Sequence, residues 1–345
     1  MIDWVTVKIQ HIHPVIQAGA VVSVDRDGLV EWQTPKAMQV AGSYESSIRV
    51  RSTGALVSSV VGHTLDGVPA SSLNTELTIS GNPAKFLQGH NLFGCDDLTK
   101  MLNGVLAKLD SSLGIGKVSP FAIAAAKVSR LDFTKSLEFG NSLQAQTYIR
   151  EVGLRARTRN GRPVMQGHTV GFQKSSKRWN LVVYAKGSEV QAHPLPDELP
   201  ARDLLIAEAQ GLVRVELRLR GTELDKINRR AVSQLEPQVL HELYDDYLGR
   251  VEMTTTTKLA NDVVLALRPA YRATYLLWLS GMDVMSTMTV PTFYRHRSLL
   301  LKYGIDISTP LDESGPNVVP LHKVITGQPY SAPSWANGTD LLFGT

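Results

Sequence analysis

The sequence predicts an α+β protein, in which a mainly antiparallel sheet carries helices packed on one side and a smaller helical domain follows. Three observations predict this class: alternating patterns typical of strands recur before residue 222, helical spacings separate several of them, and only helical patterns come afterwards. The chain has 345 residues, 43% of them hydrophobic, so it can form two domains. We expect residues 1–235 to form the first domain and residues 236–345 the second.

Three early segments alternate between apolar and polar residues, which predicts strands over residues 2–9, 46–52 and 75–80. In the first of them, alternation places Asp3 on the same face as Val5. The next expected elements, in chain order, are a loop over 83–94, a helix over 96–109 with Asp96 as its cap, a strand over 127–136, a helix over 142–153, a hairpin turn at Asn160-Gly161, a strand over 178–190, a helix over 200–210 and a strand over 211–221.

The strand predicted over 211–221 has the cleanest alternation in the chain, with Val213, Val215, Leu217 and Leu219 on its buried face. Helical patterns follow over 236–248, 258–281 and 290–304, and the run "TTTT" at 254–257 is interpreted as a linker. The last of these helices is a candidate for DNA recognition through Tyr294, Arg295, His296 and Arg297, or an ordinary helix that packs through its leucines.

The composition excludes several classes of protein. Cys95 is the only cysteine, so the chain cannot be built on disulfides. Neither a signal peptide nor a membrane-spanning stretch is recognisable, which predicts a cytoplasmic protein. The net charge of +4 permits a polyanionic partner without requiring one, so the distribution of charge matters more than its sum.

Basic residues gather between residues 155 and 178, where the sequence contains no acid. A hairpin with this charge can neutralise several phosphates, and the alternative is a solvated surface hairpin. The residues of this run predicted to contact DNA are Arg155, Arg157, Arg159, Arg162, Lys174, Lys177 and Arg178.

Two strands carry an acid within a row of basic or polar residues. Asp132 lies between Arg130 and Thr134, and Glu216 lies between Arg214 and Arg218. Such carboxylates either pair with neighbouring arginines or supply oxygen ligands to a divalent cation that stabilises charge on a phosphate.

Tyr184 and Lys186 are two residues apart on a predicted strand, so both should point to the same side of the sheet. A half-buried tyrosine usually serves packing, but tyrosine can also act as a covalent nucleophile. Its phenol has a pKa near 10, and Lys186 is the cation expected to assist it.

Five sequence blocks occur here in the order found in the replication initiators of filamentous bacteriophages, the gene II/X protein family. They are "PAKFLQGHNLFG", "VSRLDFTKS", "KRWNLVVYAKGSEVQ", "GLVRVELRL" and "NVVPLHKVI". The resemblance spans nearly the whole chain, and five ordered blocks are more specific than any single motif.

The resemblance implies a rolling-circle initiator with a nicking domain similar in plan to the HUH endonuclease superfamily. Such a protein nicks one strand of the phage replicative form at the origin through a tyrosine–5′-phosphate bond, later rejoins the displaced strand, and requires a divalent cation. The tyrosine and lysine roles carry over to Tyr184 and Lys186. From chemistry and position we assign the Mg²⁺ or Mn²⁺ ligands to His90, Asp132 and Glu216.

The remaining expectations concern partners. Double-stranded origin DNA, the displaced single strand and a host helicase are the expected partners, in the host cytoplasm. Besides the basic run, Arg214, Arg218, Arg295 and Arg297 are predicted to contact DNA. The alternative function is a replication regulator that binds the origin without cutting it.

Overall fold

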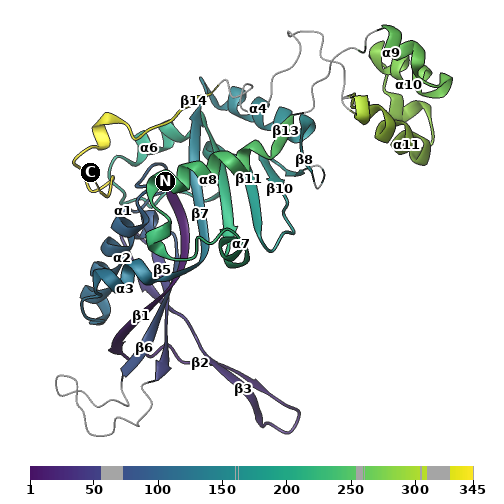
Figure 1. Ribbon diagram of the computed structural model, residues 1–345. Helices are drawn as coiled ribbons and strands as arrows, with labels where there is room; N and C mark the ends of the chain where they lie inside the picture. Colours follow the sequence, from purple (N-terminus) through teal and green to yellow (C-terminus); the bar gives the residue numbers. More distant parts are fainter. Residues whose placement is uncertain are drawn as a thin grey trace.

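The computed structural model describes residues 1–55, 73–159, 161, 163–253, 259, 261–303, 305–308 and 327–344, and its centre is one large sheet (Figure 1). Every strand pair among these residues is antiparallel. In spatial order the strands are β4 (Met38–Ala41), β5 (Ser47–Ala55), β6 (Leu73–Gly81), β1 (Ile2–Pro14), β7 (Lys127–Glu138), β12 (Leu212–Arg220), β11 (Trp179–Ala185), β10 (Thr169–Phe172) and β9 (Val164–Gln166). The predicted α+β class with a mainly antiparallel sheet is confirmed.

One face of the sheet is apolar and is covered by helices, as predicted. The row Val213, Val215, Leu217 and Leu219 is buried in the main core. The helices that contribute buried residues to this core are α1 (Pro83–Gln88), α2 (Leu98–Leu113), α3 (Pro120–Ala125), α4 (Ser142–Arg155), α7 (Gly221–Lys226) and α8 (Pro237–Gly249). Burial of apolar side chains between helices and sheet is the main stabilising contribution to this layer.

The opposite face of the sheet is covered only at one end. A smaller core there joins α5 (Lys186–Ala192) and α6 (Arg202–Ala209) to Leu92, Phe93 and the C-terminal residues. Arg214 reaches from the sheet to the carbonyl oxygen of Leu92 at 2.7 Å, which places this smaller core on the polar face. The uncovered part of that face is where polar side chains from five strands meet a cavity.

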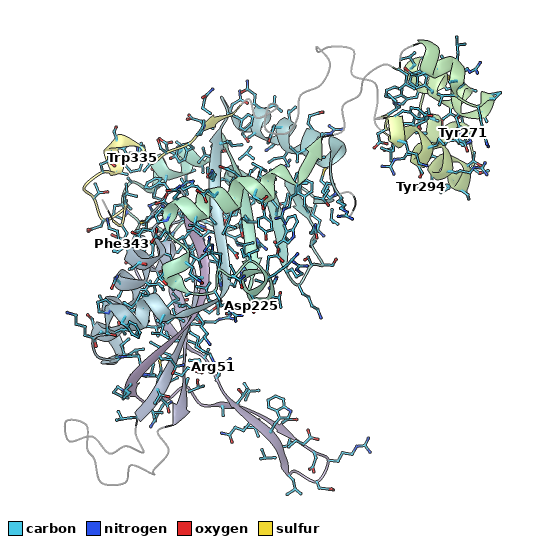
Figure 2. All side chains as sticks on the ribbon, viewed as in Figure 1. Arg51, Asp225, Tyr271, Tyr294, Trp335 and Phe343 are labelled. Atoms are coloured by element: carbon cyan, nitrogen blue, oxygen red, sulfur yellow. The ribbon has the colours of Figure 1, made fainter. Side chains whose placement is uncertain are left out.

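The C-terminal residues 327–344 pack on the sheet domain (Figure 2). Strand β14 (Gln328–Pro329) pairs with β7, and the 3₁₀ helix η6 (Ser334–Ala336) brings Trp335 against Phe93. The predicted division between residues 235 and 236 assigned this segment and α8 to the C-terminal domain. The structure packs both on the sheet instead, because their apolar side chains complete its two cores.

A separate helical unit remains between these segments. It contains α9 (Asn261–Ala266), α10 (Pro269–Leu279), η4 (Val284–Thr287), α11 (Val290–Leu300) and η5 (Leu301–Tyr303). Its buried residues, among them Tyr275, Trp278 and Phe293, form a core of their own. The helical nature of this region was predicted correctly, whereas the "TTTT" linker lies outside the described residues.

Local differences from the predictions have local causes. Residues 83–88 form α1 instead of a loop, because Asn82 caps the first turn by accepting from the Lys85 amide and Pro83 suits the first helical position. In the same way Asp97, not Asp96, caps α2. Two short ribbons were not predicted, β2 (Ala20–Val24) with β3 (Val30–Pro35) and β8 (Ala156–Thr158) with β13 (Val251–Met253). No helix among the described residues has the length and apolar content to span a bilayer.

Candidate functional site

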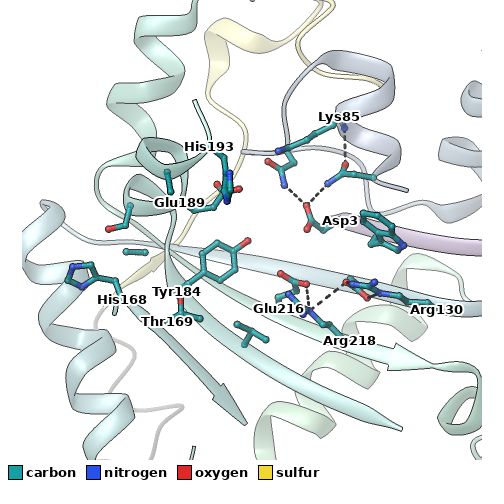
Figure 3. A pocket seen from close by; sticks show the side chains of 18 residues that line it. Asp3, Lys85, Arg130, His168, Thr169, Tyr184, Glu189, His193, Glu216 and Arg218 are labelled. Atoms are coloured by element: carbon teal, nitrogen blue, oxygen red, sulfur yellow. Dashed lines mark hydrogen bonds and ion pairs between the residues drawn. The ribbon is translucent and has the colours of Figure 1, made fainter. Parts of the chain in front are cut away.

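A cavity of about 620 Å³ opens on the polar face of the sheet, between β1, β7, β11, β12 and α5 (Figure 3). It brings together several residues that are far apart in the sequence. Its charged and polar lining includes Asp3, Lys85, Asn91, Arg130, Asp132, His168, Tyr184, Glu189, His193, Glu216 and Arg218. Three of the five predicted catalytic and metal-binding residues, Tyr184, Asp132 and Glu216, therefore line one cavity.

Tyr184 is near the end of β11, and its phenol points into the cavity (Figure 3). Strand pairing sets Tyr184 directly opposite Arg214 on β12. Burial raises the pKa of Tyr184 well above its usual value of 10, and the charge of Arg214 acts in the opposite direction. The phenol is therefore protonated at neutral pH. Arg214, beside it, is the neighbouring cation that most favours its ionised form.

Arg214 is fully buried, although the sequence suggested a strand arginine that contacts DNA at the surface. Its Nη2 donates to the carbonyl oxygen of Leu92 at 2.7 Å, and its Nε donates to Ser136 Oγ at 3.3 Å. Its Nη1 lies 3.8 Å from Asp3 Oδ1 and has no hydrogen-bond partner among the described residues. Arg214 is therefore not at the surface, where the sequence predicted it to contact DNA, because α5 and the 90–93 segment cover that end of the face.

Lys186 is the first residue of α5, since β11 ends at Ala185 and not at residue 190 as predicted. Its Nζ donates to Asn91 Oδ1 at 2.9 Å and to Glu189 Oε2 at 2.5 Å. Burial, followed by the charge of Arg214, lowers the pKa of Lys186 to about 8. This cation is thus 1% exposed and does not line the cavity itself, although its partners Asn91 and Glu189 do.

Asp132 and Glu216 both face the cavity, and each is held by an arginine. Arg130 contacts Asp132 through two hydrogen bonds of 2.9 and 2.5 Å, and Arg218 Nε lies 2.5 Å from Glu216 Oε1. Arg218 also lies 3.7 Å from Asp132. Burial and the nearby carboxylate of Asp3 raise the pKa of Glu216 to about 7. The pairing with neighbouring arginines, one of the two predicted alternatives, is present: of the two arginines that flank Glu216 in the sequence, Arg218 is its partner.

His90 is fully buried, and both of its ring nitrogens are engaged. Nε2 donates to the carbonyl oxygen of Leu341 at 2.8 Å, and Nδ1 accepts from the amide of Leu92 at 3.2 Å. Burial lowers the pKa of His90 to about 4, so the ring is neutral and has no free lone pair for a metal. The assignment of His90 as a ligand does not fit the structure; its role is to tie the C-terminal segment to the 90–93 segment.

The described residues also contain no group of three histidine, cysteine, aspartate or glutamate side chains placed to hold a metal ion. Asp132 and Glu216 are the predicted ligands that still face the cavity, but both oxygens of Asp132 accept from Arg130 and Oε1 of Glu216 accepts from Arg218. The arrangement shown does not fit a bound divalent ion unless these arginines move.

Asp3 is the principal site residue that the sequence did not reveal. It accepts hydrogen bonds from Asn82 Nδ2 at 3.0 Å and Asn91 Nδ2 at 2.6 Å, and it lines the cavity. Burial raises the pKa of Asp3, but Arg214, Lys186 and Asn91 outweigh burial and leave it below the usual 3.8. An irregularity of the β1–β7 pairing between Ile2 and Trp4 interrupts the alternation that placed Asp3 with Val5.

The predicted basic hairpin is divided among several elements. Arg155 belongs to α4, and Arg157 lies in β8, whose partner is β13 rather than β9. Arg159, Lys174 and Lys177 are exposed, as a phosphate-binding surface requires, and Arg162 lies outside the described residues. Arg178 Nε donates to Glu223 Oε2 at 2.6 Å and is not free.

In the helical unit, α11 presents a mixed surface. Tyr294 and Arg295 are exposed, but His296 is buried and bonded to Thr274, and Arg297 forms a 2.8 Å ion pair with Asp306. Of the four residues proposed for DNA recognition, two are therefore available. Arg218 in the sheet, also predicted to contact DNA, is engaged as well, because it forms ion pairs with both Asp132 and Glu216.

Comparison with known proteins identifies related chains. The family model described as the N-terminal part of the phage replication-associated protein of the gene II family matches residues 1–238, and its C-terminal counterpart matches residues 259–341. The replication-associated protein of this family from Enterobacteria phage I2-2 is 34% identical over 343 residues, which cover 97% of this chain and 96% of the relative. The one from Enterobacteria phage M13 is 32% identical over 116 residues, or 33% of this chain and 28% of the relative. A solved structure of a rolling circle replication initiator protein from Geobacillus stearothermophilus covers 76% of this chain and 88% of its own, with 12% identity and a TM-score of 0.34.

Proposed function

Since this chain belongs to the gene II family of phage replication-associated proteins, we propose that it initiates rolling-circle replication by cutting one strand of origin DNA with Tyr184. The observation that carries this proposal is the position of the Tyr184 phenol, which points into an open cavity directly opposite a buried arginine. A tyrosine that served packing alone would bury its hydroxyl in an apolar core. Here the hydroxyl faces a space large enough to admit part of a nucleotide chain.

The proposed reaction is a transfer of the phosphodiester to tyrosine. The phenol oxygen of Tyr184 forms a bond to phosphorus, and the bond between phosphorus and the 3′ oxygen of the preceding nucleotide breaks. The phenol loses its proton, and the departing 3′ oxygen gains one. The 5′ phosphate stays on the enzyme, so a later attack by a 3′ hydroxyl can rejoin the strand without ATP.

The cations around Tyr184 suit this chemistry. Because burial holds the pKa of the phenol high, its proton must leave as the bond to phosphorus forms. Arg214 beside the phenol stabilises the negative charge that develops there, and it is already fixed by Leu92 and Ser136. Lys186, whose partners Asn91 and Glu189 line the cavity, is a second fixed cation close to where the phosphate would lie.

Mixing the protein with the supercoiled DNA circle that carries its gene tests the proposal. In the presence of Mg²⁺ we expect a nicked circle whose 5′ end is attached to protein after denaturation in detergent. A circle that is shifted in a native gel but never cut would instead support the alternative, a regulator that binds the origin. The cut position found by primer extension also defines the oligonucleotides needed below.

The raised pKa of Glu216 predicts an effect on stability that can be measured without cutting DNA. The pKa of Glu216 is raised from 4.5 to about 7, so this residue contributes stability below pH 4.5 that is lost as the pH rises through 7. The difference corresponds to roughly 3 kcal/mol. We therefore expect Glu216→Gln to be stabilised relative to the wild type at pH 8 but not at pH 4.5, as measured by urea unfolding.

The requirement for Mg²⁺ or Mn²⁺ stays a prediction. An ion bound beside Glu216 would stabilise the folded protein, and the melting temperature would report this. Mg²⁺ at pH 8 should then raise the melting temperature of the wild type but not that of Glu216→Gln. Glu242→Gln, at an exposed position on α8, is the matched control and should respond like the wild type. Equal responses of wild type and Glu216→Gln to Mg²⁺ would remove Glu216 from the ligand set. The recruitment of a host helicase after the cut also remains a prediction.

A further inference from the structure

A second hollow of about 550 Å³ lies on the same polar face of the sheet as the Tyr184 cavity. Along β1, the side chains of Trp4, Thr6 and Lys8 alternate with the buried Val5 and Val7, so all three point to this face. Trp4 lines the Tyr184 cavity, and Lys8 lines the second hollow. Lys8 is four residue steps along the strand from Trp4, which corresponds to roughly 13 Å, a distance that a few nucleotides of single strand can bridge.

An aromatic ring stands at this hollow without a partner in the core. Phe121 is 82% exposed on α3, whereas Ile123 on the same helix is buried. Helix α3 directly precedes β7, which begins at Lys127, and α3 contacts β1. Phe121 therefore lies at this end of the sheet and lines the hollow. An exposed ring needs no explanation by itself, but here it borders a hollow surrounded by cations.

Three cations, Lys127, Lys8 and Arg51, lie in one row across four strands, with Thr78 between the last two. Lys127 on β7 pairs in register with Lys8 on β1, Lys8 with Thr78 on β6, and Thr78 with Arg51 on β5. Lys127 and Arg51 are exposed and form no ion pair with any described residue. Lys8 lies 2.7 Å from Glu76, the one acid in the lining.

Two arginines complete the charge of this surface. Arg230 lines the hollow; it is paired with Asp225, and its Nε has no hydrogen-bond partner among the described residues. Arg130 lies between the two hollows, because it lines the Tyr184 cavity while its neighbour Ser129 lines the second one. Its guanidinium lies 4.8 Å from the Trp4 ring. The path from one hollow to the other is thus basic and includes an aromatic ring.

We propose that the hollow bordered by Phe121, Lys127, Lys8 and Arg230 binds single-stranded DNA next to the cut, with one base stacked on Phe121. Stacking on an aromatic ring combined with a basic groove is how proteins bind unpaired nucleotides, since every base has a π face. A duplex would hide those faces, so the occupant is a single strand. The inference rests on the proposed function, because the distance to Tyr184 matters only if Tyr184 cuts DNA.

The variant Phe121→Ala tests the stack directly. Fluorescence anisotropy would use single-stranded oligonucleotides that cover the mapped cut and extend from it by about six nucleotides on one side or the other, within the site size of a single-strand groove. With one of the two extensions we expect roughly tenfold weaker binding, as for the loss of one base–aromatic stack. For the other extension and for blunt duplex, we expect the affinity of Phe121→Ala to equal that of the wild type. Because Phe121 is exposed, the melting temperature of the variant should not change.

Leu143→Ala is the matched control, since Leu143 is 72% exposed on α4, which packs on the opposite face of the sheet. Equal affinities of Phe121→Ala and Leu143→Ala for both extensions would overturn the proposal, as would weaker binding of Phe121→Ala to duplex alone. Lys127→Gln should weaken the same extension and reduce its salt dependence by about one unit of slope.

The outcome for cutting is read separately. If the wild type forms no covalent adduct, the proposed function fails whatever Phe121 does. If the wild type forms the adduct and Phe121→Ala binds both extensions as tightly as the wild type, only the inference about the second hollow fails. A crosslink from 5-iodouracil, placed a few nucleotides from the cut, to the peptide that contains Phe121 would support it independently.

Discussion

Replacement of Tyr184 by Phe is expected to abolish covalent attachment to DNA, with a loss of at least about four orders of magnitude in cutting rate. The variant keeps the ring, its packing in β11 and its place opposite Arg214, and it removes only the oxygen that would attack phosphorus. DNA binding should stay within a few-fold of the wild type, because cations distant from the hydroxyl supply it. The measurement is the yield of detergent-resistant protein–DNA adduct on supercoiled DNA, together with anisotropy on the same DNA.

Tyr148→Phe is the control for this experiment. Tyr148 lies on α4 against Phe139 in the apolar layer, on the other face of the sheet from the cavity. It should cut and bind like the wild type. If Tyr184→Phe still formed an adduct at a comparable rate, the nucleophile would be another residue and the cavity would lose its assigned role.

Replacement of Arg214 by Met is expected to have the second largest effect, on both cutting and stability. Arg214 is the charged partner of the Tyr184 phenol, and removing one fixed cation or donor from a developing negative charge typically costs about 10²–10³ in rate. The change also leaves the partly buried Asp3 without its arginine, which should destabilise the protein by roughly 3–5 kcal/mol. Cutting assays and urea unfolding measure the two effects on the same variant.

The double variant Asp3→Asn/Arg214→Met separates these two effects. Removing both charges should restore much of the unfolding free energy, since no uncompensated charge remains, while cutting stays low. Arg220→Gln, at an exposed position on the same strand, should leave both unchanged. Recovery of cutting together with stability in the double variant would mean that Arg214 serves only the fold.

The sequence by itself determined the elements whose pattern is local. The alternation over 211–221 identified the buried row of β12, and the position of Tyr184 within an alternating segment identified the face to which it points. Three of the strands that line the site, β7, β11 and β12, were predicted because each contains an apolar row of period two. Asp132 and Glu216 followed from the same alternation, which is why they reach the cavity together with Tyr184.

Only the tertiary structure decided what surrounds these residues. The β1 irregularity turns Asp3 into the cavity, and no alternation rule can locate it. Burial of Arg214 depends on α5 and on the 90–93 segment. His90 Nε2 is bonded to the carbonyl oxygen of Leu341, a residue 251 positions away. Alternation specifies the face on which a side chain lies, but its solvation and partners depend on which distant segment covers that face. For that reason the place of Tyr184 at the cavity could be predicted from the sequence, whereas the buried arginine beside it, the engagement of both His90 nitrogens and the second hollow could not.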